Sequence, residues 1–292
     1  AASLRTLLPG SSDGIRAQTI QSTPAQGSGA SPFGRTAFVN REREFAALID
    51  RLTRASAGEA HFALVSGAAG IGKTRLLDEL DAAARSRAIR VLHGRFDDRD
   101  QTFPFQGFCD AIQEYFVSEA LTAAGAPTDL SDLLPELSTL FPALGELSSA
   151  KTTAASFDSS SSQPSGPRAF VERTEVFELL ARTIIRIGAG LPLVLLLEDL
   201  HASDGSVEAL QYVVRRCSAT PTLFVATSRN EHVGSNHALT AMLESMRGDR
   251  RFELVTVGPL DASAHRELVA NLIGSESIDA GPFDRLYEIT GG

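Results

Sequence analysis

The feature that most constrains this chain is a glycine-rich turn between an apolar run and a helical pattern. The turn consists of Gly67, Ala68, Ala69, Gly70, Ile71, Gly72, Lys73 and Thr74, and Arg75 follows it. It fits the pattern G-x-x-x-x-G-K-[ST], in which glycines let backbone N–H groups surround a phosphate at the start of a helix. Apolar residues 62–66 precede the turn and a helical pattern at 75–80 follows it. The sequence therefore predicts a strand, a phosphate-binding loop and a helix.

The chemistry of this loop assigns a role to its last two residues. The Lys73 ammonium is expected to reach the β- and γ-phosphates of a nucleotide, and the Thr74 hydroxyl to hold Mg²⁺. Lysine is rare elsewhere in the chain, because the only other one is Lys151. ATP or ADP with Mg²⁺ is therefore the predicted ligand.

Composition excludes several other classes of protein. The 292 residues are 43 % hydrophobic and carry a formal net charge of −9, which argues against direct DNA binding or attachment to an anionic membrane. Residues 191–197 form the longest apolar stretch, which is too short to span a bilayer. Cys109 and Cys217 fit no metal or redox spacing, so we expect buried thiols and a cytoplasmic protein. A small basic cluster near the last strand is interpreted as a solvated turn: Arg247, Arg250 and Arg251.

Composition also divides the chain into segments. Residues 1–36 are rich in Ser, Gly, Ala, Pro and Gln and are predicted to be a flexible linker. Residues 37–258 are predicted to form the nucleotide-binding domain, with a disordered insertion at about 148–167 that includes four consecutive serines. Residues 259–292 are predicted to begin a helical subdomain that is truncated here. Because the chain starts at Ala1 rather than methionine, we expect it to be a piece of a longer protein.

Hydrophobic periodicity predicts alternating helices and strands. The predicted strands are 61–66, 89–93, 192–197, 221–227 and 251–257. The predicted helices are 41–57, 73–87, 104–124, 168–189, 204–217, 236–247, 261–273 and 280–289. Strands that are nearly continuous in Val, Leu and Ile are typical of a parallel sheet covered on both faces. We therefore expect a doubly wound α/β domain, followed by a helical subdomain with Asp261 as an N-cap.

Charged residues at two strand ends complete the predicted site. Glu198 and Asp199 follow the apolar strand 192–197, where an acidic residue can position Mg²⁺ opposite Thr74. The pattern leaves open which carboxylate organises the metal and which one polarises an attacking water. Arg229 follows the next strand and is predicted to sense the γ-phosphate, the alternative being a surface ion pair with Glu231.

Four segments taken in order resemble the motifs of a known family. Residues 39–45, the phosphate loop, residues 197–204 and residues 226–229 together look like the STAND class of AAA+-like signalling ATPases. The resemblance is to the ATPase modules of large LuxR-type bacterial regulators and of ATPase-extended adenylate cyclases or kinases. It covers the chain from about residue 37 to the end.

This resemblance implies a five-stranded sheet ordered 5-1-4-3-2 and an adenine base held near Val39 and Arg41. It also implies a switch in which ATP or ADP sets the output, attached sensor and output domains, and nucleotide-dependent homo-oligomerisation. The chain departs from the family at Asn40, where glycine is usual, and at Glu198, where aspartate is commoner.

Together these observations predict a P-loop ATPase domain that acts as a signal-transduction switch with slow Mg²⁺-dependent hydrolysis. Slow turnover suits a switch, because the bound state must last long enough to be read. One alternative is a scaffold that holds ADP without turnover. Another is the ATPase module of an adenylate cyclase or kinase.

Overall fold

The fold is taken from a computed structural model that describes residues 38–97, 105–121, 130, 132–140, 173–202, 204–234, 236–273 and 280–291. The predicted linker at 1–36 and the predicted insertion at 148–167 lie outside these residues.

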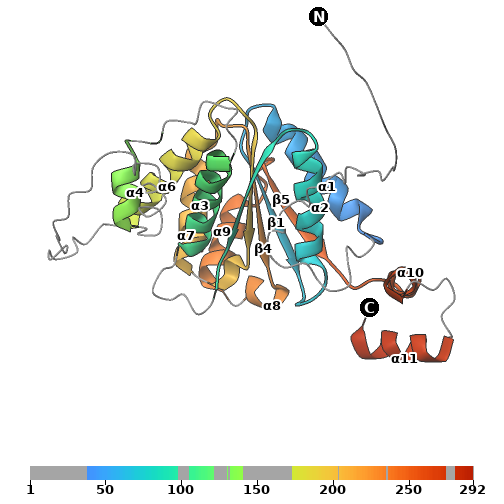
Figure 1. Ribbon diagram of the computed structural model, residues 1–292. Coiled ribbons are helices and arrows are strands. Elements are labelled where there is room, and N and C mark those ends of the chain that lie inside the picture. Colours follow the sequence, from blue (N-terminus) through green and yellow to red (C-terminus); the bar gives the residue numbers. More distant parts are fainter. Residues whose placement is uncertain are drawn as a thin grey trace, which may run out of the picture.

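Five strands form one parallel sheet at the centre of the molecule (Figure 1). They are β1 (His61–Gly67), β2 (Arg90–Arg95), β3 (Leu193–Glu198), β4 (Thr222–Ser228) and β5 (Phe252–Val257). Their order is β2-β3-β4-β1-β5, which confirms the expected 5-1-4-3-2 arrangement read from the opposite edge. Because all strands are parallel, the residues that follow β1, β3 and β4 emerge at the same edge of the sheet.

Helices cover both faces of this sheet (Figure 1). The helices on one face are α1 (Glu42–Ser56) and α2 (Lys73–Arg85). The helices on the other face are α3 (Gln106–Leu121), α4 (Leu134–Leu140), α6 (Arg173–Ile187), α7 (Asp204–Arg216) and α9 (His237–Met246). Two short elements follow strand ends, namely the 3₁₀ turn η1 (Leu200–Ala202) and α8 (Asn230–Val233).

The alternation of side chains along β1 explains why its central residues 62–65 are all apolar. Phe62 and Leu64 pack into the core under α3, α6 and α7, whereas Ala63 and Val65 pack under α1 and α2. Successive residues of a strand point to opposite faces, so a sheet covered on both faces needs apolar residues at every position. Cys109 and Cys217 are buried free thiols, as predicted.

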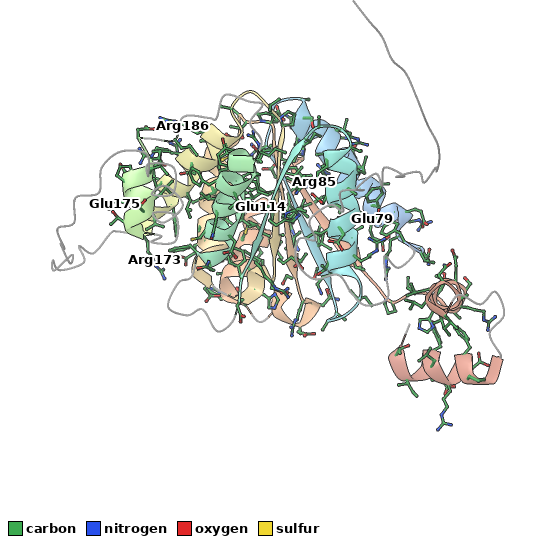
Figure 2. The ribbon with its side chains drawn as sticks, viewed as in Figure 1. Glu79, Arg85, Glu114, Arg173, Glu175 and Arg186 are labelled. Atoms are coloured by element: carbon green, nitrogen blue, oxygen red, sulfur yellow. The ribbon has the colours of Figure 1, made fainter. Side chains whose placement is uncertain are left out.

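The edge strand β2 lies against α3 with almost no space between the backbones. A Cβ atom on Gly94 would lie 1.8 Å from the carbonyl oxygen of Gly107, so no larger residue fits at this crossing. Nearby, the guanidinium of Arg85 on α2 lies 3.5 Å from the carboxylate of Glu114 on α3 (Figure 2). Glu114 also accepts hydrogen bonds from the backbone N–H and the Nδ1 atom of His93.

The last two helices form a helical subdomain beside the sheet (Figure 1): α10 (Ala262–Ile273) and α11 (Ala280–Thr290). The predicted N-cap is confirmed, because Asp261 Oδ1 accepts a hydrogen bond of 2.8 Å from the Ala264 N–H. The ring of His265 packs between Phe283 and Tyr287, which joins the two helices. None of the helices described is both long enough and apolar enough to span a bilayer.

Candidate nucleotide-binding site

The glycine-rich loop connects the end of β1 to the start of α2, as the motif requires. Gly70 and Gly72 adopt φ angles of 74° and 102°, which L side chains rarely tolerate. A Cβ atom on Gly67 would lie 2.8 Å from both Ile71 Cγ2 and the Val257 carbonyl oxygen. These three positions therefore require glycine, and the loop backbone is left open to a phosphate.

Lys73 is the first residue of α2, and its side chain turns back over the loop. Its Nζ donates hydrogen bonds to the carbonyl oxygens of Gly67 at 3.0 Å and Ala68 at 2.8 Å. Burial lowers the pKa of this ammonium, while the nearby carboxylate of Asp199 opposes that shift. The residue is thus a nearly buried cation whose protein partners are neutral carbonyl groups, and phosphate oxygens are stronger acceptors for it.

Thr74 joins the loop to the end of β3. Its hydroxyl donates a hydrogen bond of 2.5 Å to Glu198 Oε2, a residue 124 positions further along the chain. A hydroxyl and a carboxylate this close together are the oxygen ligands that Mg²⁺ takes when phosphates complete its coordination.

Asp199 lies one residue beyond Glu198 and makes different contacts. Its φ of 57° places it in the left-handed region, and its N–H donates to the Thr227 hydroxyl of β4 at 3.0 Å. Its carboxylate forms an ion pair of 3.0 Å with Arg95 at the end of β2. The two adjacent carboxylates are therefore held apart, with Glu198 on Thr74 and Asp199 on Arg95.

Arg229 follows β4 and lines the same opening as Asp199 and Lys73. Glu231, the partner in the alternative interpretation, is an exposed residue in the first turn of α8. An arginine at this edge adds positive charge where a terminal phosphate would lie.

These residues surround two adjoining cavities. One measures about 290 Å³ and is lined by Lys73, Thr74 and the charged residues of the strand ends: Arg95, Asp199 and Arg229. The other measures about 400 Å³ and is lined mainly by apolar side chains. Ala69, Gly70 and Gly72 border both, so the loop separates a charged cavity from an apolar one.

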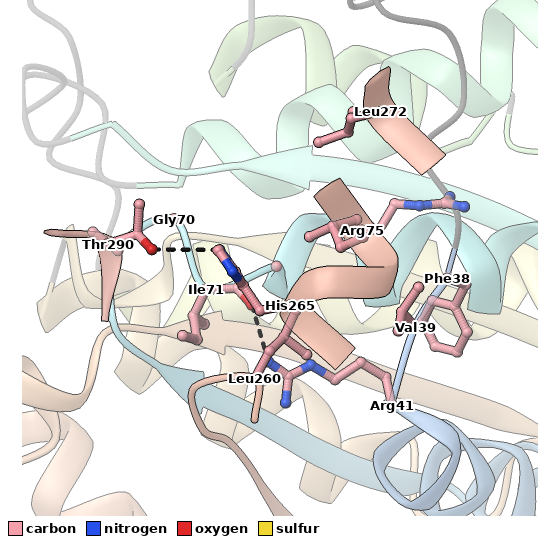
Figure 3. Close-up of a pocket in the computed structure, with 13 residues that line it drawn as sticks. Phe38, Val39, Arg41, Gly70, Ile71, Arg75, Leu260, His265, Leu272 and Thr290 are labelled. Atoms are coloured by element: carbon pink, nitrogen blue, oxygen red, sulfur yellow. Dashed lines mark hydrogen bonds between the residues drawn. The ribbon is translucent and has the colours of Figure 1, made fainter. Parts of the chain in front are cut away.

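The apolar cavity contains the residues predicted to lie near adenine (Figure 3). Val39 and Arg41 line it, and so does Arg75, which also pairs with Glu79 of α2 at 2.5 Å. Arg41 Nη2 donates to the Gly258 carbonyl at 2.5 Å and to the Ile71 carbonyl at 3.5 Å. The Arg41 guanidinium therefore contacts both the loop and the segment leading to α10.

The arrangement fits a nucleotide in size and in polarity. A base and sugar match an apolar cavity of 400 Å³, and a polyphosphate with Mg²⁺ matches the charged cavity beyond the loop. The charged cavity carries cationic groups from Lys73, Arg95 and Arg229, and carboxylates stand beside it for a metal ion. The donor set of this structure is thus suited to a magnesium nucleotide.

Sequence reasoning missed several residues that line the two cavities. These are Arg95 and Thr227 around the charged cavity, and Phe38, Leu260, His265, Leu268, Leu272 and Thr290 around the apolar one. The signal for Arg95 was available, because it ends the edge strand β2, whose neighbour β3 ends in Glu198. The residues of the helical subdomain carry no local signal, since only the chain's path around the sheet brings them to the loop.

Comparison with known proteins agrees with this geometry. The family profile described as "AAA ATPase domain" matches residues 37–225. No curated protein matches the chain.

The chain is also similar to solved structures, among them the following three. Cdc6p from Pyrobaculum aerophilum has a TM-score of 0.50 and 14 % identity, over 84 % of this chain and 52 % of its own. The ORC1 protein of Aeropyrum pernix, solved in complex with DNA, has a TM-score of 0.46 and 18 % identity, over 84 % of this chain and 52 % of its own. Drosophila ORC bound to DNA has a TM-score of 0.48 and 16 % identity, over 94 % of this chain and 60 % of its own.

The chain spans about half of the length of the Cdc6p and ORC1 chains. At this level of identity the likeness concerns the fold alone. The profile match, by contrast, covers well over half of the chain and includes the glycine-rich loop and the end of β3. By this match and by the geometry of its loop, the chain belongs to the family of AAA ATPase domains.

Proposed function

We propose that this domain is an ATP-binding switch that hydrolyses ATP slowly in the presence of Mg²⁺. The observation that carries the proposal is the hydrogen bond between Thr74 and Glu198, because it joins the phosphate-binding loop to the acidic end of β3. A phosphate loop alone accounts for nucleotide binding, whereas a loop paired with a carboxylate also accounts for hydrolysis.

In this proposal the chain's own residues bind the nucleotide, orient the attacking water and neutralise the charge of the phosphates. Lys73 exchanges two carbonyl groups for phosphate oxygens, and the backbone N–H groups of the loop complete the cradle. Thr74 and Glu198 would hold Mg²⁺, which would supply charge neutralisation on the phosphates. Asp199 orients and polarises the attacking water, and Arg229 contacts the terminal phosphate. Catalysis then consists of positioning and electrostatic stabilisation.

The finer assignment is to a signalling module of a multidomain bacterial regulator in the cytoplasm. It is supported by the motifs shared with STAND-type ATPases and by two buried cysteines that form no disulfide. The nucleotide state would be transmitted to attached sensor and output domains and would control homo-oligomerisation. A cyclase or kinase could carry the same module, because its function depends on the parts attached to it.

Lys73→Ala tests the binding site directly. Titration calorimetry with Mg-ATP should show at least a hundredfold loss of affinity, because a charge-assisted contact to the phosphates is removed. The matched control is Lys151→Ala, which removes the same charge from the only other lysine. Equal affinity of the Lys73→Ala variant and the wild type would reject the phosphate assignment.

A single-turnover ATP assay separates the proposed switch from its alternatives. A switch hydrolyses its bound ATP once over minutes, so that the triphosphate state persists long enough to be read. Rapid cycling would instead indicate an enzyme in its own right. A lack of hydrolysis even with the adjoining domains present would favour a scaffold that holds ADP.

A further inference from the structure

Asn40 occupies an unusual backbone position directly beside the apolar cavity. Its φ of 52° lies in the left-handed region, which asparagine tolerates better than most residues other than glycine. The side chain is exposed and extends toward the helical subdomain, where its Nδ2 donates a hydrogen bond of 3.1 Å to Asp261 Oδ2. Glycine could adopt the same φ but could not make this contact.

Asp261 is well suited to receive that hydrogen bond. Its other carboxylate oxygen accepts from the Ala264 N–H at 2.8 Å and from the Ser263 hydroxyl at 2.6 Å, which caps α10. The hydrogen bonds from Ala264, Ser263 and Asn40 hold the pKa of this carboxyl below its usual value. Asp261 is therefore an ionised residue with one oxygen committed to α10 and the other to Asn40.

Arg41, the next residue, contacts the start of the segment that ends at Asp261. Its guanidinium donates to the carbonyl of Gly258, where the chain leaves β5, and also contacts the Ile71 carbonyl of the loop. Two adjacent residues thus bracket the segment 258–261, which connects the sheet to α10. The contacts of both residues cross from the sheet domain to this segment.

The contacts of Asn40 and Arg41 matter because the apolar cavity lies between the sheet domain and the helical subdomain. One wall of the cavity is formed by Phe38, Val39 and Ile71 of the sheet domain, and another is formed by Leu260, Leu268 and Leu272 of the helical side. The two walls stay together only if α10 stays against the sheet domain. Separation of the walls would open the cavity to solvent.

We propose that Asn40 and Arg41 form a clamp that keeps α10 closed over the apolar cavity and slows nucleotide release. This inference rests on the proposed function, because it takes the cavity as the site of the base and sugar. Asn40 and Asp261 act as positioning residues: they hold the wall and do not touch the phosphates.

An exchange of the two side chains tests the clamp. Asn40→Asp keeps a residue that tolerates the left-handed backbone but places one carboxylate opposite another, so the release of a fluorescent ADP analogue in a stopped-flow chase should accelerate roughly tenfold. The double variant Asn40→Asp with Asp261→Asn restores the hydrogen bond with donor and acceptor reversed. Because asparagine also caps helices well, release should return to within about twofold of the wild type.

Asn271→Asp is the matched control, because it adds the same charge at an exposed position of α10 away from segment 258–261. Its release rate should equal that of the wild type. The clamp is wrong if Asn40→Asp releases the analogue at the wild-type rate. It is also wrong if the double variant stays as fast as the single one.

Hydrogen exchange without nucleotide separates this inference from the proposed function. Amides of residues 262–273 should exchange faster in Asn40→Asp than in the wild type, and the double variant should recover protection. If the wild type binds no nucleotide, the proposed function and the role in release fail together, while the exchange data still decide whether the clamp holds α10. Equal exchange in all three proteins would overturn the clamp itself.

Discussion

Two adjacent carboxylates at the end of β3 have separate environments and should have separable roles. Glu198 accepts from Thr74, whereas Asp199 adopts a left-handed backbone and pairs with Arg95. Glu198→Gln should weaken Mg²⁺-dependent ATP binding, because a neutral amide is a poorer ligand for a hard cation. Asp199→Asn should bind ATP with nearly unchanged affinity but hydrolyse it about 10² to 10⁴ times more slowly.

Titration calorimetry at several Mg²⁺ concentrations and single-turnover hydrolysis measure the two effects independently. Asparagine tolerates the left-handed φ of residue 199, so the substitution preserves the backbone. If Asp199→Asn loses Mg²⁺-dependent binding while Glu198→Gln loses only turnover, the two assignments must be exchanged.

Arg229 is the other residue whose role depends on the terminal phosphate. Arg229 lines the charged cavity together with Lys73 and Arg95. Arg229→Ala should raise the dissociation constant for ATP about ten- to a hundredfold and the one for ADP much less, as expected for one lost charge-assisted hydrogen bond. Competition binding with both nucleotides checks this, and equal losses for ATP and ADP would reject a γ-phosphate role.

At the scale of elements, a cluster around His93 links three of them through ionisable groups. His93 of β2 contacts Glu114 of α3 at 3.0 Å, and Asp81 of α2 lies 3.7 Å from its other nitrogen, next to Arg85. Burial alone would lower the pKa of His93, but the hydrogen bond and charge of Glu114, with the charge of Asp81, raise it above its usual value. Burial likewise opposes the shift of Glu114, whose pKa is held below its usual value by His93.

The sign of the pH dependence follows from these directions. A raised histidine pKa contributes stability that is present below about pH 6.5 and is lost as the pH rises through the folded-state value. Because the groups are partly exposed, the contribution should be on the order of 0.2–1 kcal/mol. Thermal unfolding should therefore show the wild type losing this stability relative to His93→Gln as the pH rises above about 6.5. Parallel curves for the two proteins would contradict the prediction.

The strands were predictable from the sequence for a physical reason. A parallel strand covered on both faces needs an unbroken apolar run, and β1, β3 and β4 each show one within a residue of the predicted bounds. Glu198, Arg229 and the loop could likewise be placed together, because parallel strands end at one edge. The sheet order came from the family resemblance.

Contacts between distant segments could not be predicted in the same way. The short helix α4 lacks the length that makes periodicity visible, and it was not expected. The contact between Asn40 and Asp261 joins residues 221 positions apart through a backbone angle that no local pattern encodes. The sequence pointed only to an unusual residue at position 40, and the structure shows what its side chain contacts.

At the scale of the whole molecule, the net charge determines whether the surface of the domain attracts or repels nucleic acid. The formal net charge is −9, and two arginines of the small basic cluster are neutralised locally. Arg250 pairs with Glu59 at 3.2 Å, and Arg251 pairs with Asp249 at 2.9 Å. Arg250 and Arg251 thus form local ion pairs near the start of β5, which is consistent with the interpretation of a solvated turn.

The negative net charge predicts that the domain by itself does not bind DNA. Binding to a duplex depends on releasing counterions with a basic face, and an acidic protein repels the phosphates instead. Fluorescence anisotropy with a labelled 30-base-pair duplex should show no binding at tens of micromolar protein in about 0.15 M salt, where nonspecific binders have dissociation constants of about 10⁻⁴–10⁻⁶ M. The measurement should be repeated with Mg-ATP and Mg-ADP, since the nucleotide adds negative charge and should not create affinity. Submicromolar binding that weakens steeply with added salt would show that a local basic surface outweighs the net charge, and any DNA contact in a longer protein could then be made by this domain.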